Sequence, residues 1–321
     1  MLNSGNANAA TGADGRAHAT AMCAAVASEL GCATEDLLVC STGLIGIPLP
    51  IEVILAGVPA LAAARGSSGD HGVAAAEAIR TTATYAKQVV VAVEGSGATV
   101  GGMAKGAAML APNMATMLAV LTTDAEVDSD TLQRTLRAAV STSFNILMTD
   151  ACRSTNDTVV LLASGAAGPV EEDRLAEAVG EACAGLAMQM ASDAEGATKV
   201  VRLRVVGAAS DAQADAGARQ IARSALCKCS WFGQDPYWGR LASELGSADI
   251  DFDQERVSVS YGGVTVAAGG VSIAHDVGAV ADHMAQRHLD IVCALGLGTG
   301  EATILTNDLT HEYIDENTGG S

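Results

Sequence analysis

The chain has 321 residues, with 18 Lys plus Arg against 37 Asp plus Glu, and its formal net charge is −19 at pH 7. A negative surplus of this size repels nucleic-acid backbones and anionic lipid surfaces, so we expect neither nucleic acid nor membrane as a partner. The acidic residues are scattered and form no long block, which is typical of a surface that keeps a protein soluble.

Targeting signals and metal motifs are missing from the sequence pattern. No run of about 18 apolar residues appears, and the start lacks the basic and apolar stretches of a secretory signal, so we expect a cytoplasmic protein. In that compartment the eight cysteines are expected to be reduced thiols. Cys227 and Cys229 are too close for a CxxC zinc motif, and the six histidines are dispersed, so we expect no metal.

The first half of the chain predicts helices and strands in alternation. Met22, Val26 and Leu30 form one apolar stripe of a helix that Gly31 can end. Strands are predicted at 88–94 and 116–123, where β-branched residues cluster. The stripe of Leu132, Leu136 and Val140 predicts the next helix, with Ser129 or Asp130 as its N-cap.

The second half adds a helix over 173–191, with Leu175, Val179 and Cys183 on one face, and strands at 157–163 and 199–206. Gly262 and Gly263 predict a hairpin, and 290–308 reads as two more strands around a Gly-rich bend. Strands and helices without regular βαβ alternation predict an α+β fold, which we expect to be a single compact unit over residues 1–321.

Thr116 lies at the head of one predicted strand, in the stretch KGAAMLAPNMATMLAVLTTD at 105–124. A threonine hydroxyl needs a base to become a nucleophile, and the α-amine of an N-terminal Thr, with a pKa of about 7.7 to 8.0, can serve as that base. Such a site would require cleavage of the Ala115–Thr116 bond. From the residues alone, a β-forming threonine at a strand end is the stronger interpretation.

The stretch KGAAMLAPNMATML closely resembles the self-cleavage segment of the ornithine acetyltransferase family, also called glutamate N-acetyltransferases. Further matching stretches follow in the same order along the whole chain. They are NSGNANAATG at 3–12, STGLIG at 41–46, TVGGMAKG at 99–106, STNDTVVLLA at 154–163, DAEGATK at 193–199 and DPYWGR at 235–240. Several of these motifs are long enough that chance is a poor explanation.

The resemblance implies two β-sheets between helical layers, in the fold shared with DmpA-like proteins. It implies self-cleavage into chains 1–115 and 116–321, which remain associated and assemble into a heterotetramer or a larger oligomer. The implied enzyme carries an acetyl group from N-acetylornithine to glutamate on a threonine ester, in arginine biosynthesis. It needs no cofactor, although some members also accept acetyl-CoA as acyl donor.

The resemblance also assigns roles to individual residues. Thr116 is implied as the nucleophile, and Thr42 with Gly43 as the donors to the oxyanion. The implied substrate-binding residues are Thr81, Lys105, Thr116, Glu195, Asn317 and Ser321, with the Glu195 carboxylate suited to a substrate ammonium group. A lone lysine is ordinarily a solvated surface residue, and the GGMAKG context is what favours a functional role for Lys105.

Three departures from the family pattern bear on function. Family members usually carry several tens of residues before NSGNAN, so we expect a shortened member whose maturation is in question. Family members commonly have a run like ITVDGDTSTND at the position of SFNILMTDACRSTND. In this chain a glycine and an acid of that run are replaced by Ala151, Cys152 and Arg153, which puts the substrate preference in doubt. The tail keeps Asn317, while Ser321 stands where the family has a terminal threonine.

Two alternatives to the acetyltransferase stay open. An N-terminal-nucleophile amidohydrolase or aminopeptidase would pass the acyl group to water in place of glutamate. An inactive relative would stay uncut and bind an amino acid or a partner chain. A specialised pathway other than arginine synthesis is open as well.

Overall fold

In the computed structural model the described residues are 1–109, 117–152 and 156–318. They group into two compact units. The first comprises Met1–Ala107, Met114–Thr142 and Arg153–Leu186, and the second Ala108–Asn113, Ser143–Cys152 and Ala187–Ser321. Each unit is built around its own sheet, the four-stranded sheet in the first and the seven-stranded sheet in the second.

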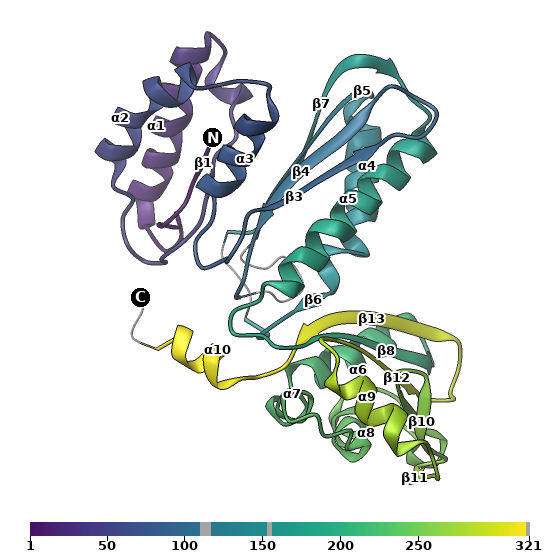
Figure 1. Cartoon of the computed structure of the whole chain (residues 1–321). Coiled ribbons are helices and arrows are strands. Elements are labelled where there is room, and N and C mark those ends of the chain that lie inside the picture. Colours follow the sequence, from purple (N-terminus) through teal and green to yellow (C-terminus); the bar gives the residue numbers. More distant parts are fainter. Residues whose placement is uncertain (110–116, 153–155, 319–321) are drawn as a thin grey trace. The chain divides into compact units, whose positions relative to one another are not determined.

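The first unit is organised by a four-stranded sheet in the order β3 (Lys87–Ala92), β4 (Thr99–Lys105), β5 (Leu118–Glu126) and β7 (Thr158–Pro169). β4 pairs antiparallel with β3 and β5, while β5 and β7 are parallel. Figure 1 shows α4 (Ser129–Ser141) and α5 (Glu172–Ser192) along one face of this sheet. The N-cap of α4 is Asp128, whose carboxylate accepts the N–H groups of Asp130 and Thr131, so neither predicted cap was right.

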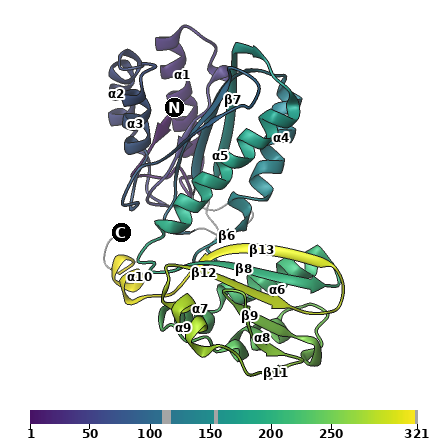
Figure 2. The ribbon, with the colours of Figure 1, turned by 45° about the vertical axis from the view of Figure 1, so that its right-hand side comes forward.

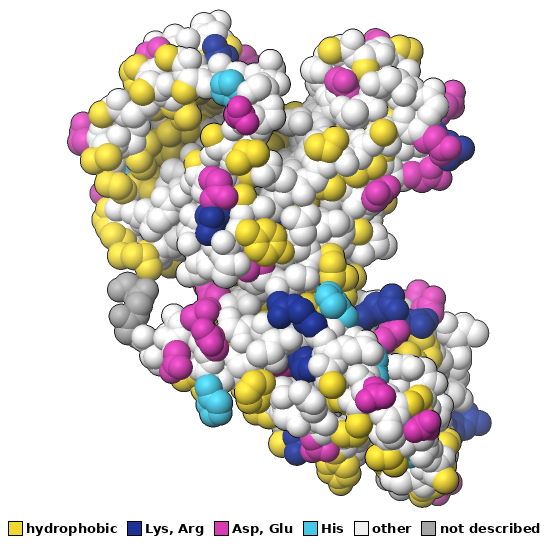
Figure 3. Space-filling view, in the orientation of Figure 1, with side chains coloured by type: hydrophobic (Ala, Val, Ile, Leu, Met, Phe, Trp, Pro, Cys, Tyr) yellow, Lys and Arg dark blue, Asp and Glu magenta, His cyan; other side chains and the backbone are white. Residues whose placement is uncertain are grey.

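The two faces of this sheet meet different helices. A Cβ at Gly102 would lie 3.2 Å from Leu186, so this strand position faces α5. The next residue, Met103, lines an apolar groove with residues of α1 (Gly12–Leu30), α2 (Ile51–Ala63) and α3 (Gly69–Ala78), as strand alternation requires. In Figure 3, hydrophobic side chains gather over these three helices. The predicted helix is confirmed as α1, and Gly31 ends it with a φ of 69°.

A small two-stranded sheet also belongs to the first unit. β1 (Leu2–Asn3) and β2 (Cys40–Ser41) pair in parallel, and an isolated bridge joins Asn6 to Leu44 just beyond them. This sheet matters because β2 runs directly into the STGLIG motif.

The second unit is built on a seven-stranded sheet. Its strand order is β11 (Val271–Ser272), β10 (Val264–Ala268), β9 (Ser258–Tyr261), β12 (His288–Ala294), β8 (Val200–Ala208), β13 (Gly300–Asn307) and β6 (Leu147–Met148). The hairpin predicted at Gly262 and Gly263 is confirmed between β9 and β10. β8 lies between β12, to which it is parallel, and β13, to which it is antiparallel.

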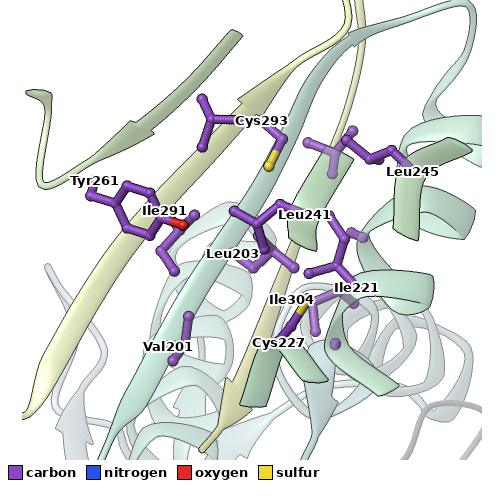
Figure 4. Packing of buried hydrophobic residues seen from close by; sticks show 14 of the residues in the cluster. Val201, Leu203, Ile221, Cys227, Leu241, Leu245, Tyr261, Ile291, Cys293 and Ile304 are labelled. Atoms are coloured by element: carbon purple, nitrogen blue, oxygen red, sulfur yellow. The ribbon is translucent and has the colours of Figure 1, made fainter. Parts of the chain in front are cut away.

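Helices cover this second sheet. α6 (Asp211–Arg223) packs against β8 and β13, and α7 (Ala225–Phe232) and α8 (Trp238–Ser247) pack with α6 (Figure 2). α9 (Val277–Ala285) contacts β9, and α10 (His311–Glu316) lies near the C-terminus. Figure 4 shows Leu203 of β8 and Ile304 of β13 among side chains of α6, α7 and α8. These contacts remove the apolar face of the sheet from water, the main favourable term in folding.

The arrangement confirms the predicted α+β class with two larger sheets, to which the structure adds the small third one. Three short 3-10 turns complete the regular structure, at Thr34–Asp36, Phe144–Ile146 and Gln254–Arg256. Over the described parts of the chain, no helix combines the length and apolar character needed to cross a membrane.

Candidate active site

The STGLIG motif forms a tight turn directly after β2. The Thr42 N–H donates to the Asn3 carbonyl at 3.1 Å, and the Leu44 N–H donates to the Gly5 carbonyl at 3.3 Å. Between them Gly43 has a φ of +127°, and a Cβ there would lie 2.2 Å from the Gly5 carbonyl carbon. Only glycine fits this position. Among the described residues, the Gly43 N–H has no hydrogen-bond acceptor, so it is available as a donor.

Lys105 reaches this turn from the end of β4. Its Nζ donates a hydrogen bond of 2.8 Å to the Thr42 Oγ1. The Thr42 side chain is buried, with 1% of the residue exposed, and Lys105 is 4% exposed. The predicted pair Thr42–Gly43 and the predicted Lys105 are therefore brought together, although 63 residues separate them in the chain.

The start of β5 lies beside this cluster. Lys105 is the register partner of Leu118, two residues after Thr116. Met117 is fixed on the other side of the strand, because its N–H donates to Asp157 Oδ1 at 2.9 Å and its carbonyl accepts the Thr158 N–H at 3.0 Å. Ala115 and Thr116, the residues of the predicted cleavage site, lie outside the described residues.

Cys40 connects β2 to the same region. Burial raises the pKa of the Cys40 thiol, and the positive charge of the N-terminus, with a smaller effect of Thr158, opposes part of that rise. Thr42, which directly follows β2, is joined by its hydrogen bond to Lys105 at the end of β4, and Lys105 is paired with the start of β5. Three strand ends, those of β2, β4 and β5, converge in the first unit.

Thr81 is placed differently from these residues. It is exposed, in the turn between α3 and β3, where the Arg80 side chain donates to the carbonyls of Ala83 and Thr84. Within the described residues no hydrogen bond joins Thr81 to Thr42 or Lys105. Thr81 is therefore not part of the hydrogen-bonded cluster of Thr42 and Lys105, and its role as a substrate contact stays a prediction.

Glu195 and Asn317 meet in the second unit. The Asn317 Nδ2 donates to the Glu195 Oε2 at 2.9 Å, which joins the DAEGATK motif to the end of α10. Gly196 makes this approach possible, because a Cβ there would lie 2.2 Å from the Tyr313 nitrogen. The Thr310 hydroxyl donates to the Gly196 carbonyl at 2.7 Å. Ser321 lies outside the described residues.

Two carboxylates near the motifs were missed by the sequence patterns. Asp157 holds Met117, as described above. Asp150 accepts the Met109 N–H at 2.7 Å and lies 3.5 Å from the Tyr313 hydroxyl, whose pKa is raised mainly by burial and further by this carboxylate. Asp150 lies shortly after β6, and Asp157 lies directly before β7. An acidic residue next to a predicted strand was the sequence feature that could have identified them.

The described residues contain no group of three His, Cys, Asp or Glu side chains placed to hold a metal ion. What the first unit offers instead is a buried hydroxyl, a backbone N–H without an acceptor and a buried ammonium group beside the start of β5. Preorganised donors of this kind stabilise a developing oxyanion. The α+β fold thus holds a cluster whose chemistry suits an acyl-transfer enzyme.

Comparison with known proteins identifies the family. The ArgJ family model matches residues 1–319, and the chain belongs to this family. This confirms the predicted membership of the ornithine acetyltransferases. The arginine biosynthesis bifunctional proteins ArgJ of Thermobifida fusca and Streptomyces coelicolor are 45% and 46% identical to the chain, over all of it and 82% of their own length. The protein of the same name from Mycobacterium leprae is 47% identical and is covered over 79%.

A solved structure agrees with the fold. The crystal structure of the arginine biosynthesis bifunctional protein argJ from Bacillus halodurans matches with a TM-score of 0.58 and 32% sequence identity. The match covers 62% of this chain and 96% of that one. The predicted ornithine-acetyltransferase fold is therefore confirmed.

Proposed function

We propose that the protein moves the acetyl group of N-acetylornithine to glutamate through an ester on Thr116, after cleaving itself at Ala115–Thr116. Its acetyltransferase class and its place in arginine biosynthesis follow from the ArgJ family and from relatives named for that pathway. The cleavage, the ester and the residue roles are the proposal. The observation that carries them is the Thr42–Gly43 turn, in which Thr42 is buried against Lys105, the partner of the first β5 residue, and the Gly43 N–H has no acceptor among the described residues.

Self-cleavage begins when the Thr116 hydroxyl attacks the Ala115 carbonyl. The acyl group moves from the Thr116 nitrogen to its oxygen, and water then hydrolyses the ester, which frees the α-amine of Thr116. That amine has an ordinary pKa of about 7.7 to 8.0, so part of it is neutral near pH 7 and can act as base.

Acetyl transfer then proceeds in two steps at one oxygen. Thr116 attacks the acetyl carbonyl of N-acetylornithine, and the amine of ornithine leaves with a proton. The amine of glutamate attacks the resulting ester and regenerates the Thr116 hydroxyl. Each tetrahedral intermediate places negative charge on the carbonyl oxygen, where the Thr42 hydroxyl and the Gly43 N–H would donate.

Glu195 and Asn317 are proposed to bind the substrate, with the carboxylate receiving an ammonium group. Thr81, Lys105 and Ser321 complete the set that the family resemblance implies. Acetyl-CoA is proposed as an alternative acyl donor, and no cofactor is required by the chemistry. We further propose that the two chains assemble into an oligomer of αβ pairs in the cytoplasm.

The first test is the intact mass of the purified protein under denaturing conditions, with N-terminal sequencing of any fragment. A fragment that begins Thr-Met-Leu-Ala-Val supports cleavage before Thr116, and T116S should cleave whereas T116A should stay intact. Product analysis with and without glutamate then separates transfer from hydrolysis to acetate. An uncut wild-type chain that binds an amino acid would favour the inactive relative.

A further inference from the structure

We propose that Lys105 acts in catalysis through Thr42, by orienting and polarising the hydroxyl that donates to the oxyanion. This inference rests on the proposed function and changes the role of one residue in it, because the family resemblance gives Lys105 to the substrate. In this proposal Lys105 is a positioning residue for the oxyanion site.

The direction of the hydrogen bond between Lys105 and Thr42 supports this role. A lysine ammonium group has three donors and no acceptor, so in the 2.8 Å contact the Thr42 Oγ1 must accept. The hydroxyl proton of Thr42 cannot point back at Lys105 and is left to donate elsewhere. Lys105 thereby selects the hydroxyl orientation in which Thr42 can serve an oxyanion.

The charge carries the second step. A hydrogen bond from a cation is stronger than one between neutral groups, and a hydroxyl that accepts such a bond becomes a better donor through polarisation. Thr42 and Lys105 are 1% and 4% exposed, so water does little to weaken this effect. The ammonium group also adds its own positive potential at the place where negative charge develops.

The backbone carries the third step. Gly43 follows Thr42 in the turn, and its N–H has no acceptor among the described residues. β4 holds the Lys105 backbone opposite Leu118, the residue that begins β5. One rigid turn thus presents a hydroxyl and an N–H, and a strand of the main sheet holds the cation behind the hydroxyl.

No proton leaves Lys105 in the reaction. The bond between Thr116 Oγ and the acyl carbon forms as the carbonyl oxygen gains charge, and the bond to the departing amine breaks as the carbonyl returns. Self-cleavage passes through a tetrahedral intermediate of the same kind, formed at the Ala115 carbonyl with the Thr116 nitrogen as leaving group, and needs no amino-acid substrate. Self-cleavage therefore separates the two possible roles of Lys105. A lysine that positions Thr42 affects the rate of self-cleavage, whereas a lysine that only binds the substrate does not.

The experiment follows self-cleavage in time, by cell-free synthesis of the full chain and denaturing mass spectrometry of fragments 1–115 and 116–321. We expect K105M to slow cleavage at least tenfold, since loss of one oxyanion donor costs about 100- to 1000-fold. T42S, which keeps the hydroxyl, should stay within about threefold of wild type. K199M removes another buried amine, which donates to the carbonyls of Met284 and Gln286, and should cleave at the wild-type rate.

A double-mutant cycle separates coupling from general damage. If Lys105 acts through Thr42, K105M in the T42V background should add less than about a twofold further loss. If the rate losses of K105M and T42V multiply in the double variant, the proposal is overturned. It is also overturned if K105M cleaves at the wild-type rate and only its KM in acetyl transfer is raised. A wild-type chain that fails to cleave would refute the proposed function itself, whereas normal cleavage by K105M would refute only the positioning role of Lys105.

Discussion

Replacing Gly43 by alanine tests the oxyanion turn most directly. A Cβ at this position would lie 2.2 Å from the Gly5 carbonyl carbon and 2.5 Å from the Asn6 nitrogen. Carbon atoms ordinarily approach to about 3.5–4.0 Å, so the turn must move by more than 1 Å. The atoms in its way are backbone, which cannot swing aside as a flexible side chain can. The Gly43 N–H and the Thr42 hydroxyl would therefore lose their common alignment.

The size of the effect has two parts. A non-glycine residue at a φ of +127° costs about 1–3 kcal/mol of stability. Loss of one aligned donor costs about 2.7–4 kcal/mol of transition-state stabilisation, or about 100- to 1000-fold in rate. We expect G43A to lose both, and to slow self-cleavage as well as acetyl transfer.

Gly46 provides the matched control. It has a φ of +79°, yet a Cβ there meets nothing within 4 Å, so G46A should lose only the stability. Urea denaturation measures the first part, and the time course of fragment formation measures the second. If G43A cleaves within about threefold of the wild-type rate, Gly43 is not a donor to the oxyanion.

Three further predictions concern other parts of the chain. N317A removes the donor to Glu195 and should raise KM for the amino-acid substrates about tenfold, with self-cleavage unchanged; slower cleavage would argue against a substrate role. Burial lowers the pKa of Lys228 to about 8, below its unfolded value of about 10.4, so the unfolded chain binds more protons between those pH values. Wild-type stability in urea should therefore rise more than that of K228M from pH 8 to pH 9.5, by about 1–2 kcal/mol, and equal slopes would contradict the buried-amine argument. Iodoacetamide should alkylate native protein at the exposed thiols of Cys32, Cys152 and Cys229. The buried thiols of Cys227 and Cys293, whose pKa values burial raises to about 11 and about 12, should react only after denaturation, and early labelling there would contradict the packing.

The regular elements were accessible from sequence where one periodicity dominates. The stripe of Met22 and Val26, closed by Gly31, predicts α1 because a buried helical face and a left-handed C-terminal glycine are both local features. The cap of α4 was misassigned, because Asp128, Ser129 and Asp130 are three cap-competent residues in a row and only the backbone geometry selects Asp128. The division into two units has no linker to announce it, since the chain passes between the units several times.

The site was predictable as a set of residues but not as a geometry. Thr42, Gly43 and Lys105 were identified through motifs, whereas the contact between Thr42 and Lys105 depends on how β2 and β4 pack. Asp157 was missed because its function is to receive the N–H of Met117, a partner 40 residues away. Cleavage before Thr116 stays a prediction.

The place of β5 in its sheet has a consequence for a severed chain. Six register pairs, from Val100 opposite Thr123 to Lys105 opposite Leu118, join β4 to β5 across the proposed cut. The first fragment could leave only by exposing side chains such as Val100, Leu118 and Leu121, which are now fully buried. Fragments 1–115 and 116–321, made separately and mixed, should therefore reconstitute the fold by strand complementation, and the peptide bond between them is dispensable once the sheet has formed.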